Sequence, residues 1–174
     1  MIVLETDRLV LRHLDPDKDL EFVVRLLNEP SFLRYIGDKG VRTLDDARQY
    51  LLTGPVASYE KNSYGLYLMQ LKHSLMPVGI CGLVKRDYLP DPDIGFALLP
   101  QFWKHGYALE AATGVMRYAT ETLKINRVVA ITEPTNETSA RLLEKLGLRF
   151  ERMLDETNGP VKLFTPIQNM SDKL

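Results

Sequence analysis

The chain has 174 residues, of which 45% are hydrophobic and 26% are charged. This length and composition are typical of a single globular domain, here residues 1–174, whose core is large enough to fold without disulfides or structural metals. The 22 basic and 23 acidic side chains leave a formal net charge of −1, so no overall field favours nucleic acid or an anionic membrane as a partner.

The cysteine content and the start of the chain favour a cytoplasmic location. Cys81 has no partner for an internal disulfide, and its apolar neighbours Ile80 and Leu83 predict a buried strand thiol rather than a nucleophile. Charged residues appear before an apolar run typical of a signal peptide can form, and no later run has transmembrane length. The sequence also predicts no metal site, because its three histidines lie far apart: His13, His73 and His105.

Apolar periodicity in the first third of the chain predicts one strand and two helices. A short apolar run at residues 9–11 indicates a strand. Apolar residues at three-to-four spacing then predict a helix over about residues 15–28, and Pro30 limits how far it continues. A second helix is predicted from residue 43 or 45 through 51, with Gly54 and Pro55 as an interruption.

The rest of the chain combines strands and helices. From Ser63 the side chains follow a period of two, and a turn at Met76 and Pro77 predicts a β-hairpin, followed by a third strand at residues 91–99. The further predicted elements are a helix at about 106–123, a strand at 127–132, a helix at about 136–146, and strands at 150–154 and 161–164. This mixture predicts an α/β fold of the α+β type, with helices around one central sheet.

Residues 103–108 join a predicted strand to a predicted helix and have the properties of an anion-binding site. A helix N-terminus offers unpaired backbone N–H groups and the positive end of the helix dipole, and Gly106 lets a phosphate approach the backbone closely. Lys104 adds a cation, and His105 adds another when protonated. A plain glycine turn before an amphipathic helix explains the same residues, so both interpretations stay open at this point.

Three groups of residues resemble the motifs of a known family. They are Ile94, Gly95, Phe96, Pro100, Phe102, Trp103, Gly106, Tyr107, Ala108, Glu110 and Ala111; the opening Thr6, Asp7, Arg8, Leu9, Leu11 and Arg12; and Asn136, Ser139, Leu143, Lys145, Leu146 and Gly147. In order and spacing they resemble the GNAT N-acetyltransferases, and most of all the RimJ/RimL branch. The resemblance is weakest at residues 33–63 and after residue 164. It implies a GNAT-like fold with a mixed, mostly antiparallel central sheet flanked by helices.

The resemblance also implies how acetyl-CoA, the acetyl donor, is bound. In the family, the turn that matches Trp103, Lys104, His105, Gly106, Tyr107 and Ala108 binds the coenzyme pyrophosphate through backbone amides. The strand that matches residues 93–99 bulges away from its neighbour, and Gly95 is where a bulge costs least. The pantetheine arm then pairs with backbone near Phe96, Ala97 and Leu98. Asn136 matches a residue beside the pantetheine, although helix capping alone also explains it.

The implied reaction is transfer of the acetyl group to a primary amine, either a protein N-terminus or a small molecule, by direct attack in a ternary complex. Many GNAT enzymes protonate the leaving thiolate with a tyrosine at the position of Leu143, so Ser139 is the expected catalytic residue for that step here. A solvated first-turn serine is the simpler alternative. Asp93 and Glu151 are candidates for the base, and each is also explained as a solvated surface carboxylate.

Two further expectations stay open at this point. A noncatalytic coenzyme A-binding regulatory domain is the alternative function, since Leu143 replaces the tyrosine and no residue is an evident base. The resemblance also allows a homodimer.

Overall fold

The computed structural model describes residues 1–167, which begin with an antiparallel β-hairpin. Its strands are β1 (Ile2–Glu5) and β2 (Leu9–His13). The sequence predicts β2 but not β1. In the turn between them, the backbone N–H of Thr6 donates to the carbonyl of Leu9 at 2.9 Å. The hairpin therefore places the Thr6–Arg8 turn at one end of the sheet.

Helices fill the segment between β2 and the next strand, and two of them differ from prediction. The first, α1 (Leu20–Leu27), begins five residues later than expected. The buried carboxylate of Asp19 accepts the backbone N–H of Asp15 and pairs with Arg12 at 2.7 Å, which holds the preceding residues in a turn. Pro30 then starts a short helix, α2 (Pro30–Tyr35), since proline is well suited to the first helical position.

The second predicted helix, α3 (Leu44–Leu51), is confirmed, and Thr43 caps it. The sequence predicts that the helix is interrupted at Gly54 and Pro55, but the structure has no break there. The chain continues as a π-helical turn, Leu52–Val56, directly into α4 (Ala57–Asn62). A wider turn accommodates Pro55 because proline has no N–H to donate within an α-helix.

The predicted hairpin and third strand are confirmed as β3 (Leu66–Leu71), β4 (Pro77–Val84) and β5 (Asp93–Leu98). With β1 and β2 they form a five-stranded antiparallel sheet in the order β1-β2-β3-β4-β5. Successive side chains alternate between its faces. Tyr67 and Met69 therefore pack in the cluster that includes the long helix α5, while Leu68 and Ile80 pack against the N-terminal helices.

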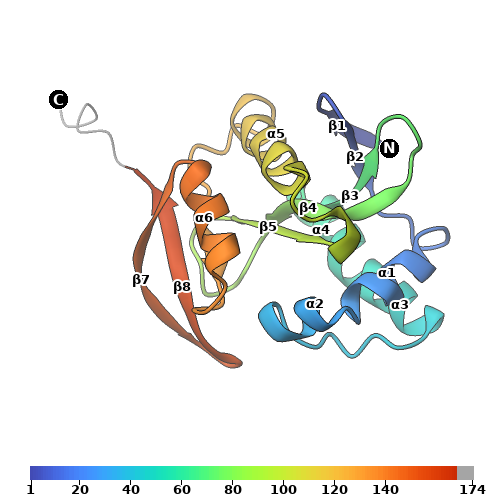
Figure 1. Ribbon diagram of the computed structural model, residues 1–174, viewed down its shortest axis with the longest axis horizontal. Helices are drawn as coiled ribbons and strands as arrows, with labels where there is room; N and C mark the ends of the chain where they lie inside the picture. Colours follow the sequence, from blue (N-terminus) through green and yellow to red (C-terminus); the bar gives the residue numbers. More distant parts are fainter. Residues whose placement is uncertain (168–174) are drawn as a thin grey trace.

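The C-terminal part of the chain contains two helices and a second, smaller sheet. The helices are α5 (Tyr107–Glu121) and α6 (Glu137–Lys145), and the strands are β6 (Ala130–Thr132), β7 (Leu148–Glu156) and β8 (Gly159–Pro166). The strands pair antiparallel in the order β6-β8-β7. Figure 1 shows this sheet and α6 beside α5, with α1, α2 and α3 gathered at the other side of the molecule. The mixed, mostly antiparallel arrangement flanked by helices matches the predicted fold class.

Within residues 1–167, the two sheets join at a single parallel bridge between β5 and the residue that precedes β6. Ile94 N–H donates to the Val129 carbonyl at 2.9 Å, and Val129 N–H donates to the Pro92 carbonyl at 3.0 Å. The helix α5 packs against β4 and β5 with the face that carries Ala111, Ala112, Val115 and Ala119, all buried. Within residues 1–167, no helix is long and apolar enough to cross a membrane.

Candidate active site

An open strand edge lies where β5 and β6 separate. The pairing between them is confined to the bridge at Asp93 and Val129 in the described part of the chain, yet β5 continues to Leu98. Ile94 N–H points to β6 and Leu99 N–H points to β4, where it donates to Val78. Since backbone groups alternate along a strand, the N–H and C=O of Phe96 and the N–H of Leu98 face the gap. Unpaired N–H and C=O groups along a strand edge can pair with another extended chain, so this edge favours a ligand with an extended amide chain.

The predicted bulge at Gly95 is absent from the β4–β5 pairing. Register runs without a shift from Gly79 opposite Leu98 to Val84 opposite Asp93, and Gly95 lies opposite Gly82. The gap opens instead on the other edge of β5, because β6 diverges from it. Ala97, predicted as a contact of the coenzyme, lies opposite Ile80, so its backbone groups face β4 rather than the gap.

The turn from β5 into α5 is held in an unusual backbone conformation. A 3₁₀ turn at Pro100–Phe102 leads into Lys104 and Gly106, whose φ angles of 63° and 80° are left-handed. The Trp103 indole Nε1 donates to the carbonyl of Leu98 at 3.0 Å. His105 Nδ1 donates to the Trp103 carbonyl at 2.7 Å, because a carbonyl oxygen can only accept. Residues on both sides of the turn therefore fix its shape.

This turn leaves the N-terminus of α5 open. Gly106 is the N-cap residue and has no side chain to accept the first N–H groups, whereas Thr43 accepts the Asp46 N–H at the start of α3. The first turn of a 15-residue helix thus presents unpaired donors together with the positive end of its dipole. Lys104 is exposed beside it. We call this open N-terminus and Lys104 the α5 cradle; its geometry is the one that the anion-binding interpretation of the sequence requires.

A clamp from the β1–β2 turn holds the first turn of α5. Glu110 accepts hydrogen bonds from Thr6 Oγ1 at 2.6 Å, from Arg8 N–H at 2.8 Å and from Arg8 Nε at 2.6 Å. Partial burial opposes ionisation, but these donors from Thr6 and Arg8 hold the pKa of Glu110 below its ordinary value. Glu110 and Arg8 both stand in the motifs quoted from the sequence, but no contact between them was predicted. The spacing of Thr6 and Arg8 in the opening motif is the signal that was available.

Asn136 and Ser139 lie at the start of α6. Asn136 Oδ1 accepts the Ser139 N–H at 3.2 Å, so Asn136 is the N-cap of this helix. Ser139 is half-buried, and its hydroxyl makes no hydrogen bond within residues 1–167. Leu143, one turn further, is 1% exposed and packs in the main core. The side chain at the family's tyrosine position is therefore a core side chain here.

Of the two candidate bases, Asp93 differs from the expectation of a solvated carboxylate. It is 1% exposed at the junction of the two sheets, and its Oδ1 lies 2.9 Å from Arg86 Nε. Burial raises the pKa of Asp93, although the charge and hydrogen bond of Arg86 oppose the shift. Glu151 is exposed on the edge strand β7, where Arg152 lies 3.5 Å away. Only Asp93 has the environment of a functional carboxylate.

Cys81 is fully buried in the core between the sheet and α5. Burial raises the pKa of its thiol, so the neutral form dominates at physiological pH. This confirms the prediction of a buried strand cysteine and argues against an acyl-enzyme route through it.

The sequence profile of the Acetyltransferase (GNAT) domain matches residues 8–149. The chain belongs to the GNAT acetyltransferase family. It is 29% identical over 154 residues to the uncharacterized N-acetyltransferase YoaA of Bacillus subtilis, covering 87% of this chain and 85% of that protein. The chain is thus an acetyl-CoA-dependent acyltransferase, as family membership requires.

Solved structures agree with the GNAT fold. An acetyltransferase from Agrobacterium tumefaciens superposes with a TM-score of 0.80 at 22% identity, covering 95% of this chain and 94% of that one. RimL, described as a ribosomal L7/L12 alpha-N-protein acetyltransferase in complex with coenzyme A, has a TM-score of 0.83 at 15% identity, covering 96% and 98%. The predicted family is confirmed, and its RimJ/RimL-like branch is consistent with these neighbours.

Proposed function

We propose that the protein moves the acetyl group of acetyl-CoA directly to a primary amine, either a protein N-terminus or a small molecule, in a ternary complex. One observation carries the proposal: the open edge of β5 leads into the uncapped N-terminus of α5. An extended amide chain and a diphosphate, the two parts of coenzyme A between its thiol and its nucleoside, fit these two features in that order. We also propose that residues 1–174 form a single domain.

The backbone supplies most of the proposed coenzyme contacts. Phe96 C=O and Leu98 N–H pair with the amides of the pantetheine arm, and Phe96 N–H faces the thioester carbonyl. Ala97 contributes its place in the strand rather than a backbone bond. The pyrophosphate lies on the N–H groups of the α5 turn, whose proposed contact residues are Trp103, Lys104, His105, Gly106, Tyr107 and Ala108. Asn136 uses its Oδ1 to cap α6, so its amide NH₂ is the group left for the arm.

Acetyl-CoA supplies the acetyl group as a thioester. Residues around the gap stabilise the negative charges that develop on the carbonyl oxygen and on the sulfur during the reaction. The amine nitrogen forms a bond to the carbonyl carbon as the carbon–sulfur bond breaks. The Phe96 N–H stabilises negative charge on the carbonyl oxygen. The Ser139 hydroxyl, which has no other acceptor within residues 1–167, donates a hydrogen bond to the departing thiolate.

The attacking amine must lose a proton, and we assign its removal to Asp93. The carboxylate lies at the point where β5 and β6 meet, next to the start of the gap. With only 1% of the residue exposed, it acts through a water molecule rather than by direct contact. A raised pKa brings a carboxylate closer to the basicity that proton transfer from an ammonium requires.

Release of the coenzyme thiol tests the proposal. The purified protein is incubated with acetyl-CoA and a panel of small amines and N-terminal peptides, and free coenzyme A is measured with a thiol reagent. Acceptor-dependent thiol release, with mass spectrometry showing acetylated product, is expected. Binding of acetyl-CoA without release for any acceptor class would contradict the catalytic proposal and favour a regulatory coenzyme A-binding domain.

A further inference from the structure

Arg86 has unused hydrogen-bond donors beside the proposed base. It lies in the loop between β4 and β5, and its Nε donates to Asp93 Oδ1 at 2.9 Å. Its two terminal nitrogens make no hydrogen bond within residues 1–167. The Arg86 side chain is 31% exposed, whereas the Asp93 side chain is 2% exposed. The carboxylate is therefore hidden from solvent, while part of the guanidinium remains accessible.

The accessible end of Arg86 lies where the acceptor has to approach. Asp93 is the residue of β5 that bridges to Val129, and the gap between β5 and β6 begins directly after that bridge. An amine whose proton passes through a water molecule to Asp93 stands close to this carboxylate. A group attached to that amine is then within reach of the Arg86 guanidinium. Two neighbouring N–H donors of a guanidinium match the two oxygens of a carboxylate.

Lys39 adds a second cation near Arg86. It follows α2 in a turn that is held by the ion pair of Asp38 with Arg42, 2.6 Å apart. Lys39 is exposed, yet partial burial of its ammonium lowers its pKa, the Arg86 charge adds to the shift and the Glu156 carboxylate opposes it. The three charged groups therefore lie near one another. In the described part of the chain, the Lys39 ammonium makes no ion pair.

Glu156 approaches this group from the tip of the β7–β8 hairpin. Figure 1 shows the hairpin tip and α2 on the same side of the molecule. The Oε1 atom of Glu156 is buried and has no hydrogen-bond partner among residues 1–167. This oxygen therefore faces protein rather than the open side of the site. Glu156 attracts Lys39 without forming an ion pair with it, so the ammonium keeps its donors for a ligand.

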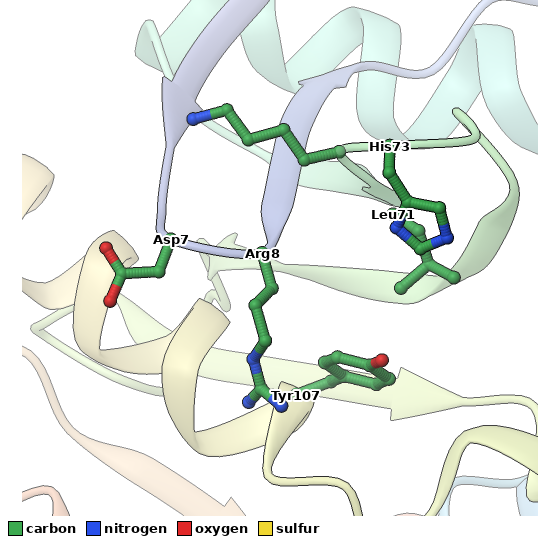
Figure 2. A pocket seen from close by; sticks show the side chains of 6 residues that line it. Asp7, Arg8, Leu71, His73 and Tyr107 are labelled. Carbon is green, nitrogen blue, oxygen red and sulfur yellow. The ribbon is translucent and has the colours of Figure 1, made fainter.

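Cations on the side of the proposed coenzyme site already have carboxylate partners. Figure 2 shows the pocket beside the α5 cradle, with Arg8 extending from its turn towards Tyr107. Arg8 Nε donates to Glu110 at 2.6 Å, and the Lys72 ammonium pairs with Glu5 at 2.8 Å. By contrast, the two cations near the start of the gap present donors to an acceptor.

We propose that the acceptor carries a carboxylate close to its amine, and that the terminal nitrogens of Arg86 bind this carboxylate with Lys39 beside them. The inference rests on the proposed acetyl transfer and narrows its acceptor to one chemical class. Two sources share this chemistry: a free amino acid, and a peptide with an acidic side chain next to its N-terminus. A carboxylate gives both cations a counter-charge, which an amine without an anionic group does not.

Acceptors matched in shape and different in charge test the proposal. Amino acids are compared with their carboxamides, and peptides with Asp or Glu in second position are compared with the same peptides carrying Asn or Gln there. Thiol release from acetyl-CoA gives kcat/KM for each acceptor. In one of the two arms the acid should be preferred roughly tenfold to a hundredfold, the effect of hydrogen bonds between charged groups, and that arm identifies the source.

The outcomes separate this inference from the proposed function. Acetyl transfer without a preference for the acid in either arm would overturn the inference and leave the transfer activity intact. No transfer to any acceptor would overturn the proposed function as well.

Two variants connect the preference to these side chains. Lys39→Gln leaves the ion pair of Arg86 with Asp93 in place, and it should reduce the preference for the acid several-fold without changing acetyl-CoA affinity. Arg86→Gln should bring the preference close to one, even though loss of the ion pair also lowers the rates with both acceptors of a pair. A purely structural role of Arg86 would lower both rates equally and leave the preference unchanged.

Lys124→Gln is the matched control. It makes the same charge change beyond the C-terminal end of α5, where the Lys124 ammonium donates to the Glu121 carbonyl at 2.7 Å, and it should keep the wild-type preference. Comparing variant with wild type cancels any difference in amine basicity between the acceptors of a pair. A wild-type preference in both Lys39→Gln and Arg86→Gln would overturn the inference.

Discussion

Replacing Gly106 with alanine separates the stability of the cradle from its ability to bind a phosphate. Gly106 has φ of 80°, and a left-handed alanine costs about 1–2 kcal/mol relative to an ordinary conformation. The added Cβ would meet only Arg8, at 3.4 Å, so steric strain adds little. For a chain of this size, the melting temperature should fall by roughly 2–8 °C.

Gly147→Ala supplies the matched control. Gly147 has φ of 88° at the end of α6, and a Cβ there meets nothing within 4 Å. It should therefore cost a similar free energy of unfolding, far from the α5 turn. The two variants share a backbone penalty and differ in whether the new methyl group stands over the proposed phosphate site.

Thermal unfolding with and without coenzyme A distinguishes them. A ligand at 100 times its dissociation constant stabilises the folded state by about 2.7 kcal/mol. Wild type and Gly147→Ala should both show this stabilisation, whereas Gly106→Ala should lose most of it because the methyl group keeps phosphate from the N–H groups. Equal coenzyme-induced shifts in the two glycine variants would refute the assignment of the turn as the pyrophosphate site.

Three other predictions follow from the site. Ser139→Ala should bind acetyl-CoA normally and turn over at least tenfold more slowly, in proportion to one lost hydrogen bond to the thiolate; unchanged turnover in steady-state assays would remove Ser139 from the mechanism. Burial raises the pKa of Asp93 above 3.8 in the folded state. The folded protein therefore keeps a proton on Asp93 that the unfolded chain has released. The contribution of Asp93 to the free energy of unfolding consequently declines as pH rises above 3.8. Asp93→Asn should remove that decline in denaturant titrations and also lower turnover with little change in coenzyme affinity; a wild-type rate in this variant would exclude Asp93 as the base. Cys81 should resist thiol reagents in the native protein and react only on unfolding, whereas rapid native labelling would contradict its burial.

Structural elements that depend on residues close together in the chain could be predicted from the sequence. The period of two after Ser63 and the turn at Met76 and Pro77 identified β3 and β4, because both signals come from residues close together in the chain. The turn at Gly106 between a strand and a helix was also predicted, since a strand, a glycine and an amphipathic helix in that order are local signals. The late start of α1 was not, because it depends on the tertiary pair of Arg12 and Asp19.

Features that join distant segments were missed for the same reason. The Arg8–Glu110 contact spans 102 residues, and no periodicity links the two positions. Asp93 was interpreted as a surface carboxylate because charged side chains are rarely buried, yet it lies buried at the bridge to Val129, where it pairs with Arg86. The gap beside Phe96 comes from the divergence of β6 rather than from a bulge at Gly95. This divergence depends on how two strands are placed, so it could not be predicted from the sequence of one strand.

Residue-resolved amide hydrogen exchange, measured with and without coenzyme A, tests the central claim most directly. The account predicts that the coenzyme slows exchange at Phe96 and Leu98, whose N–H groups face the gap, and at the first N–H groups of α5. Ala97 should change much less, because its N–H already faces β4. Protection of α5 together with unchanged exchange at Phe96 and Leu98 would contradict the placement of the pantetheine arm, and no protection at either place would contradict coenzyme binding at this site.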